Sequence, residues 1–171
     1  VYGTGPLSFV FALDAGTGEE KWRWDPAIPD AGHGGPGACC GNVNRGVALH
    51  GDKIFVGLLD GRLVALNRES GTVEWTVQTT PAGSDYTITG APRVARDKVI
   101  IGNGGAEYGV RGYVTAYDVE RGDQVWRTYT VTGNPADGFE NDTMRIAADT
   151  WTGNWWIAGG GGTVWDAMVY D

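Results

Sequence analysis

The only two cysteines of the chain are neighbours, Cys39 and Cys40, in the stretch GACCGNVNRG. A disulfide between adjacent residues departs from ordinary disulfide geometry and stores strain. The loop it closes is too short to constrain the unfolded chain, so stability alone does not explain such a bridge. Two reduced, partly buried thiols are an equally good interpretation. A metal site is the weaker alternative, because adjacent side chains converge poorly on one ion and no second Cys/His pair has ligand spacing.

A second candidate segment follows an apolar run, in the stretch IIGNGGAEYGVRG at residues 100–112. Its plain interpretation is a glycine-rich hairpin loop. The small residues before Glu107 would also let a flat ligand approach the backbone closely. The carboxylate of Glu107 is a ligand type that hard cations such as calcium prefer. The segment therefore combines room for a ligand with a charge suited to a metal.

A third segment, WTGNWWIAGGGGTVWDAM at residues 151–168, carries four consecutive glycines before Thr163 and Trp165. This order predicts an indole at an exposed strand start beside open backbone. A further core position is the alternative interpretation of Trp165. Trp155 and Trp156 are expected to be packing residues.

The composition limits the fold and the partners. With 171 residues, 42% of them hydrophobic, and eight tryptophans, the chain should be globular. Its 29 glycines follow no collagen period, which favours many short strands joined by tight turns and hence an all-β class. A net charge of −8 without any basic cluster argues against nucleic acid as a partner. No apolar run approaches the ~20 residues needed to span a membrane.

Other catalytic signatures are missing from the sequence. His33 and His50 have no partners at catalytic spacing and are expected on the surface or in loops. Neither a Gly-x-Ser-x-Gly elbow nor a phosphate-binding loop is present. Hydrolase and nucleotide-binding functions therefore have no support.

A repeat organises the chain. The motif reads Ala, an apolar residue, Asp or Asn, a turn containing Gly, and then Trp, and it occurs at residues 12–22, 65–75 and 116–126. Its tryptophans, Trp22, Trp75 and Trp126, are 53 and 51 residues apart. A period of this size is typical of propeller blades or solenoid turns.

Each repeat is predicted to be a small antiparallel sheet of about four strands. Residues 51–67 give two strand-like runs joined by an Asp60-Gly61 hairpin turn. The Asp or Asn and the Gly of the motif should form the turn into the last strand, and the Trp should pack between adjacent sheets. Two regions depart from the pattern. Residues 25–44 should be irregular, and in 133–149 Asp142 or Thr143 should cap a short helix, MRIAADTW.

Together these residues resemble the quinoprotein alcohol dehydrogenases, the family that uses pyrroloquinoline quinone (PQQ). The repeat looks like the family's tryptophan-docking motif, which joins the blades of an eight-bladed β-propeller. The Cys-Cys-x4-Arg and Gly-Gly-Ala-Glu-x-Gly-x-Arg-Gly stretches occur in the family's order. The ending GGGGTVWDAMVYD looks more like the quinohaemoprotein or general alcohol dehydrogenase branch than the methanol dehydrogenase branch.

The resemblance implies a role for particular residues. Cys39 and Cys40 match a vicinal disulfide that lies against one face of PQQ, and Trp165 matches the indole on which PQQ stacks. Arg45 matches an arginine at the reactive carbonyl side, and Glu107 matches a carboxylate ligand of calcium or a lanthanide. The other matching cofactor contacts are Thr89, Gly104, Gly105, Ala106 and Thr163. In such a slot, the arginine and the cation would polarise the quinone carbonyl as it accepts hydride from an alcohol.

The resemblance also implies what lies outside this sequence. Residues 1–171 are expected to be the N-terminal part of a propeller domain and to cover about three blades. The general base, an aspartate, and an asparagine metal ligand are expected beyond Asp171, and a glutamate contact before Val1. No catalytic residue is therefore expected within the chain. A haem c domain is left open, because no Cys-x-x-Cys-His motif occurs here.

The expected protein is a periplasmic oxidoreductase, since an oxidising compartment would preserve a vicinal disulfide. Its partners would be a small primary alcohol and cytochrome c or a similar electron acceptor. The residues leave two alternatives open. One is a PQQ-dependent sugar or polyol dehydrogenase, in which the vicinal pair is not expected. The other is a non-catalytic propeller scaffold, which has no physical reason to keep the cysteines together with Arg45 and Glu107.

Overall fold

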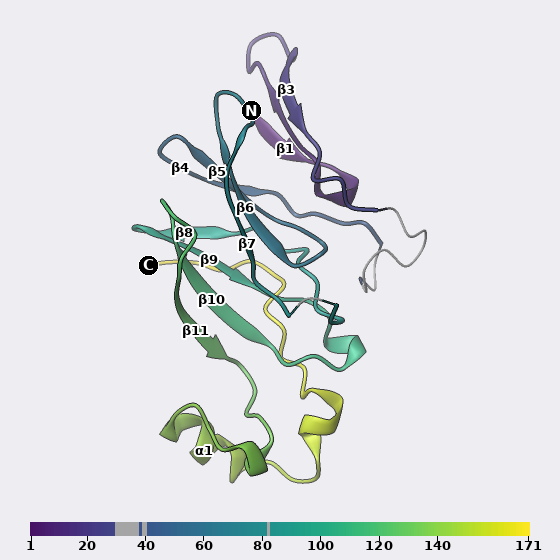
Figure 1. The fold of residues 1–171 in the computed structure, drawn as a ribbon, viewed down its shortest axis with the longest axis vertical. Coiled ribbons are helices and arrows are strands. Elements are labelled where there is room, and N and C mark those ends of the chain that lie inside the picture. Colours follow the sequence, from purple (N-terminus) through teal and green to yellow (C-terminus); the bar gives the residue numbers. More distant parts are fainter. Residues whose placement is uncertain (30–37, 39–40, 82) are drawn as a thin grey trace.

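The computed structural model describes residues 1–29, 38, 41–81 and 83–171, and within them the chain forms three antiparallel sheets. Figure 1 shows the sheets following one another in chain order along the long axis of the molecule. The first sheet contains β1 (Tyr2–Thr4), β2 (Val10–Leu13) and β3 (Glu20–Trp24). The second contains β4 (Val47–His50), β5 (Lys53–Gly57), β6 (Arg62–Asn67) and β7 (Val73–Gln78). The third contains β8 (Arg93–Ala95), β9 (Lys98–Gly102), β10 (Tyr113–Asp118) and β11 (Gln124–Tyr129).

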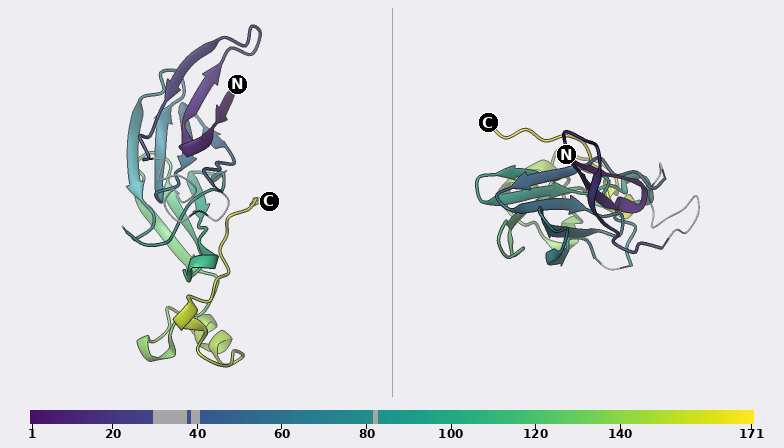
Figure 2. Two further views of the ribbon diagram at one scale, coloured as in Figure 1. Left: turned by 90° about the vertical axis from the view of Figure 1, so that its right-hand side faces the viewer. Right: turned by 90° about the horizontal axis from the view of Figure 1, so that it is seen from above.

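Each sheet is a meander in which consecutive strands pair. The first strands of neighbouring sheets contact one another, β1 with β4 and β4 with β8. Figure 2 shows the three sheets as successive layers that together form a curved stack. This is the arrangement of blades in a β-propeller, so the predicted all-β propeller fold is confirmed. The first blade has three strands among the described residues instead of the expected four.

The middle sheet is buried on both faces. Alternate side chains of a strand point to opposite faces, so Ile54 and Val56 of β5 pack in the cluster shared with the first sheet. Phe55, between them, packs in the cluster shared with the third sheet. All three side chains are fully buried. Two-sided burial explains why β5 is a continuous apolar run instead of an alternating one.

The turn of the repeated motif has the same hydrogen bonds in all three sheets. The side-chain oxygen of Asp14, Asn67 or Asp118 accepts from the main-chain N–H groups two and three residues later, at 2.8–3.2 Å. The motif glycine follows at φ +77°, +73° or +74°, a conformation that glycine adopts without steric cost. As predicted, the Asp or Asn and the Gly together build the turn before the last strand.

The motif tryptophans join neighbouring sheets. The indole of Trp22 packs on Gly71 of the second motif, where an added Cβ would lie 2.6 Å from Cε3 of the ring. Trp75 packs in the same way on Gly122, at 2.8 Å. Each indole N–H donates to a carbonyl just after β6 or β10, at 3.2 and 3.1 Å. Trp126, on the last described motif, is 42% exposed.

The segment after β11 extends away from the sheets, at the lower end of Figure 1. It contains η4 (Pro135–Asp137), α1 (Asp142–Ala148) and η5 (Trp155–Ala158). The predicted cap and end of the helix are both wrong. Asn141 is the cap, since its side chain accepts from Met144 N at 2.9 Å, and the helix ends at Ala148. Asn141 precedes both expected caps, Asp142 and Thr143, and acts as the cap because its side chain reaches the N–H of the third helical residue.

Several smaller predictions have outcomes in the structure. Trp155 and Trp156 are half-buried and contact each other edge to face, at 4.9 Å between ring centroids, as expected for packing residues. His50 is exposed at the end of β4, whereas His33 lies outside the described residues. None of the helices in the described ranges is long and apolar enough to cross a membrane.

Candidate functional site

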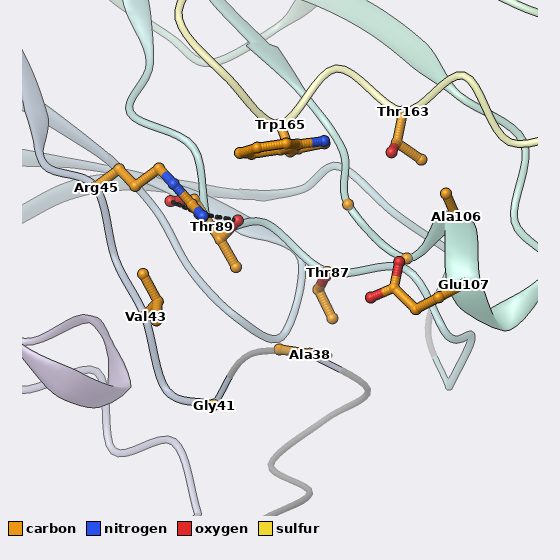
Figure 3. Close-up of a pocket in the computed structure, with 12 residues that line it drawn as sticks. Ala38, Gly41, Val43, Arg45, Thr87, Thr89, Ala106, Glu107, Thr163 and Trp165 are labelled. Atoms are coloured by element: carbon orange, nitrogen blue, oxygen red, sulfur yellow. Dashed lines mark hydrogen bonds between the residues drawn. The ribbon is translucent and has the colours of Figure 1, made fainter.

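A cavity lies where four segments converge: the segment before β4, the segment before β8, the β9–β10 loop and residues 163–165. It has about 560 Å³ of empty space, which includes its open mouth. Figure 3 shows the residues that line this cavity. Every predicted site residue within the described part of the chain lines this cavity: Arg45, Thr89, Gly104, Gly105, Ala106, Glu107, Thr163 and Trp165. Cys39 and Cys40 lie outside the described residues, and the flanking Ala38 and Gly41 line the cavity.

Arg45 is held by its main chain and its side chain. Its N–H donates to Thr89 O at 3.0 Å, and its Nη1 donates to Thr89 Oγ1 at 2.6 Å. The guanidinium lies 4.9 Å from the centroid of the Trp165 ring, within the range of a cation–π interaction. The preceding Asn44 fixes the loop, because its side chain donates to Gly57 O at 2.8 Å and accepts from Gly46 N at 2.9 Å. The positive charge is therefore placed at one end of the cavity before any ligand binds.

The Glu107 loop depends on two glycines and a buried amide. Gly105 has φ +101°, and a Cβ there would overlap Asp85 O, so a side chain is excluded by conformation and by space. Gly104 pairs with Thr87 through a main-chain hydrogen bond of 2.7 Å, and the fully buried Asn103 accepts from Tyr113 N at 2.8 Å. The short helix η3 (Ala106–Tyr108) then presents Glu107 at the cavity.

The carboxylate of Glu107 is available for a ligand. Figure 3 shows it turned toward the cavity, on the side of Thr87. Glu107 is exposed and takes part in none of the ion pairs among the described residues. A carboxylate without an internal cation can contribute its charge to a bound metal.

Two tyrosines beneath this loop carry no charge near neutral pH. Burial raises the pKa of Tyr86, whose hydroxyl accepts from Arg111 N at 3.2 Å. Burial also raises the pKa of Tyr113 to about 12, and its ring lies 5.8 Å from that of Tyr86. Neither phenol therefore adds a negative charge behind Glu107.

Thr163 and Trp165 belong to a segment that we call the strap, residues 161–168, which crosses the end of the third sheet. One end of the strap is fixed by the N–H of Gly112, which donates to Gly161 O at 2.7 Å, and by the Thr130 hydroxyl, which donates to Gly162 O at 2.6 Å. The other end is fixed by Arg93 Nε, which donates to Met168 O at 3.1 Å. The predicted strand start at Thr163 is wrong, because residues 163–171 contain no strand. The preceding glycines, 159–162, all have positive φ, which no extended strand allows.

Sequence reasoning missed several cavity residues, of which Thr87 is the most informative. Thr87 is 2% exposed and lines the cavity between Thr89 and Glu107 in Figure 3. Ile88 between the two threonines is 1% exposed and packs in the core. Alternate residues of an extended segment point the same way, so the order Thr-Ile-Thr was the available signal. Ala38, Gly41 and Val43 also line the cavity; they lie in the stretch GACCGNVNRG, of which only the cysteines and Arg45 were predicted as site residues.

Comparison with known proteins gives a consistent result. A family model described as "PQQ: Glucose/ethanol/alcohol dehydrogenase, beta-propeller domain" matches residues 1–171. The chain is 55% identical to quinohemoprotein alcohol dehydrogenase ADH IIB of Pseudomonas putida, and the match covers all of this chain and 25% of that protein. The crystal structure of quinohemoprotein alcohol dehydrogenase from Comamonas testosteroni is similar with a TM-score of 0.94 and 51% identity, over 99% of this chain and 26% of that one.

A more distant structure, a europium-containing methanol dehydrogenase, has a TM-score of 0.83 and 34% identity over 99% of this chain and 31% of that one. The higher identity to the quinohemoprotein dehydrogenases agrees with the branch that the sequence ending indicated. The chain spans about a quarter of the length of the curated relatives it matches.

Proposed function

Because the chain belongs to the PQQ family of glucose, ethanol and alcohol dehydrogenase β-propeller domains, we propose that its cavity binds PQQ and a metal cation in an enzyme that oxidises primary alcohols to aldehydes. One observation carries the proposal. Residues from four separate segments, all of them predicted as site residues from the sequence, line a single cavity. When bound, PQQ supplies an electrophilic quinone carbonyl that accepts hydride from the alcohol.

The shape of the cavity suits a planar ring system. The indole of Trp165 forms one wall and is 45% exposed, so a face of the ring is accessible to a ligand. Gly104 and Gly105 bring main chain rather than side chains to the cavity surface. An aromatic ligand stacked on the indole would bury apolar surface on both partners.

The polar groups suit the chemistry of a tricarboxylate quinone. Arg45 contributes a fixed positive charge at one end, where it favours negative charge that develops on a carbonyl oxygen. The hydroxyls of Thr89 and Thr163 face the same space as Arg45 and can orient carboxylates by hydrogen bonding. In this arrangement the protein binds and orients, while no described residue of the chain is proposed as the general base.

We propose Glu107 as one ligand of calcium or of a lanthanide. Calcium takes about six to eight oxygen ligands, so one carboxylate must be joined by other groups. The described residues contain no group of three His, Cys, Asp or Glu side chains that could hold a metal ion. We propose that the remaining oxygens come from the cofactor and from residues outside 1–171, as the family resemblance implies.

The vicinal disulfide, the compartment and the acceptor complete the proposal. Cys39 and Cys40 are proposed to form a disulfide that faces the cofactor opposite Trp165. Such a bond persists in an oxidising compartment, which supports a periplasmic location. Relatives with quinohemoprotein in their names support electron transfer to haem. A relative from Thauera butanivorans named 1-butanol dehydrogenase (cytochrome c) supports cytochrome c as the acceptor.

Reconstitution tests this function. The full-length protein is loaded with PQQ and either calcium or a lanthanide, and reduction of an artificial dye is followed with primary alcohols and with glucose. Dye reduction with alcohols and not with glucose is expected. Bound PQQ without dye reduction by any alcohol would contradict the alcohol dehydrogenase assignment, and reduction by glucose alone would favour a sugar dehydrogenase.

A further inference from the structure

The strap rests on a row of three glycines at the end of the third sheet, which we call the glycine row: Gly90 before β8, Gly102 at the end of β9 and Gly112 before β10. We propose that the glycine row is a positioning element that sets where the Trp165 indole lies over the cavity. The proposal deepens the cofactor function above and rests on it for the identity of the ligand.

Each glycine of the row meets a main-chain atom of the strap. A Cβ added at Gly112 would overlap Gly162 O, and one at Gly102 would overlap Val164 O. A Cβ at Gly90 would lie 2.7 Å from the carbonyl oxygen of Trp165 itself. Real Cβ atoms do not approach carbonyl oxygens this closely, so the strap would have to move.

The conformation of the row does not demand glycine. None of Gly90, Gly102 and Gly112 has a positive φ, unlike the glycines of the motif turns. An alanine could therefore adopt the backbone conformation at all three positions. Glycine is required at these positions because the strap leaves no room for a side chain. The requirement therefore comes from the segment that carries Thr163 and Trp165 and not from local folding.

A displaced strap cannot relax by rotating a side chain. The nearest strap atoms to Gly102 and Gly90 are main-chain oxygens, and the next atom at Gly102 is Val164 Cβ, which no rotation of that side chain moves. Hydrogen bonds to Gly112, Thr130 and Arg93 fix both ends of the strap. Movement must therefore appear in the middle, at Val164 and Trp165. There it changes the separation of the indole from Arg45, now 4.9 Å, and from the opposite side of the cavity.

Small displacements matter at a stacking surface. A gap of ~0.5–1 Å forfeits a quarter to a half of the dispersion energy between contacting atoms. Misplacement of a positioning group by ~1 Å can reduce a rate about 100-fold. The glycine row thus acts on cofactor binding without touching the cofactor.

The test uses Gly90→Ala and Gly102→Ala in the full-length protein. Gly16→Ala is the matched control, because Gly16 also lacks a positive φ and the atom nearest to a Cβ added there, Asp14 Oδ1, is 3.4 Å away. Two quantities are measured. One is PQQ affinity. The other is acrylamide quenching of Trp165 fluorescence in the apoprotein, obtained by subtracting the matched Trp165→Phe variant.

We expect both row variants to bind PQQ at least about tenfold more weakly and to change Trp165 quenching, while Gly16→Ala changes neither. Unchanged quenching in folded row variants overturns the proposal, whether or not PQQ affinity falls. Changed quenching with unchanged PQQ affinity also overturns it. If Gly102→Ala does not fold, Gly90→Ala decides the test, because its added Cβ would approach the strap less closely, at 2.7 Å.

Failure of the unaltered protein to bind PQQ refutes the proposed function. The quenching measurement still tests whether the glycine row sets the position of the indole.

Discussion

Tryptophans lie against glycines in two regions of this molecule, and the two arrangements differ. In the blades, Trp22 and Trp75 pack on motif glycines whose φ is positive, and their indole N–H groups donate to the facing sheet. At the cavity, the main chain of Trp165 lies over Gly90, whose φ is ordinary, and its indole donates to none of the described residues. The indoles of Trp22 and Trp75 therefore satisfy both their N–H group and their apolar faces with contacts inside the fold. Trp165 keeps an exposed ring, so it can bind a ligand.

The comparison therefore separates stability from function. Substitutions in the blade contacts should lower the free energy of unfolding and leave the cofactor site intact in molecules that fold. Substitutions at the cavity should weaken cofactor or metal binding and leave the free energy of unfolding nearly unchanged. Four changes test this separation.

The largest effect is expected for Glu107→Ala. Loss of a carboxylate metal ligand removes several kcal/mol of electrostatic stabilisation, which corresponds to roughly a 100- to 1000-fold loss of alcohol oxidation. The unfolding midpoint should not move, because Glu107 is exposed and outside the ion pairs of the described residues. Glu19→Ala, an exposed change in the first turn, is the control. Unchanged metal affinity in Glu107→Ala would remove this residue from the metal site.

Trp75→Ala should act on the fold. It removes the indole that packs on Gly122 and its hydrogen bond to Val119 O, at a cost of about 3 kcal/mol in the free energy of unfolding. Urea denaturation measures this loss. PQQ affinity of the folded variant should match that of the unaltered protein. A large fall in affinity without a loss of stability would mean that the blade contact also shapes the site.

Trp165→Ala should show the opposite pattern. The exposed indole contributes little to folding, whereas the lost stacking surface should weaken PQQ binding by about 1–3 kcal/mol. PQQ titration and urea denaturation of the same preparation separate the two effects. A result like that of Trp75→Ala, with lost stability and unchanged PQQ affinity, would make Trp165 a core residue.

The smallest effect concerns pH and the first motif turn. Hydrogen bonds from the main-chain N–H groups of Gly16 and Thr17 lower the pKa of Asp14 below its ordinary value. A carboxyl group whose pKa is lower in the folded state than in the unfolded state stabilises the fold at pH values above its unfolded-state pKa. This contribution is lost as the pH falls through the folded-state pKa. Asn67 makes the same turn without titrating, so Asp14→Asn should keep the turn. Comparing melting temperatures at pH 7 and pH 3, we expect a slightly smaller acid-induced decrease in Asp14→Asn; an equal decrease would show that the turn does not contribute.

Much of the fold could be predicted because the motif is repeated. The spacing of Trp22, Trp75 and Trp126 predicted blades, and the Asp or Asn with Gly predicted each turn, since these contacts recur between neighbouring units. The helix was predicted with the wrong cap, because Asn141, Asp142 and Thr143 are all capping residue types and only the main-chain geometry chooses among them. The strand expected at Thr163 was wrong, because the strap crosses the end of the third sheet over Gly102 and Gly90 and forms no strand.

The sequence by itself determined the residue types that can do chemistry and the repeat that builds the blades. Both are local properties, carried by side-chain identity and by a regular spacing. Only the tertiary structure decided that Thr87 faces the cavity, that the strap crosses the third sheet, and that Gly90, Gly102 and Gly112 leave room for it. These facts depend on how segments far apart in the chain fit against one another. Such a steric fit produces no repeated spacing that could be recognised in the sequence.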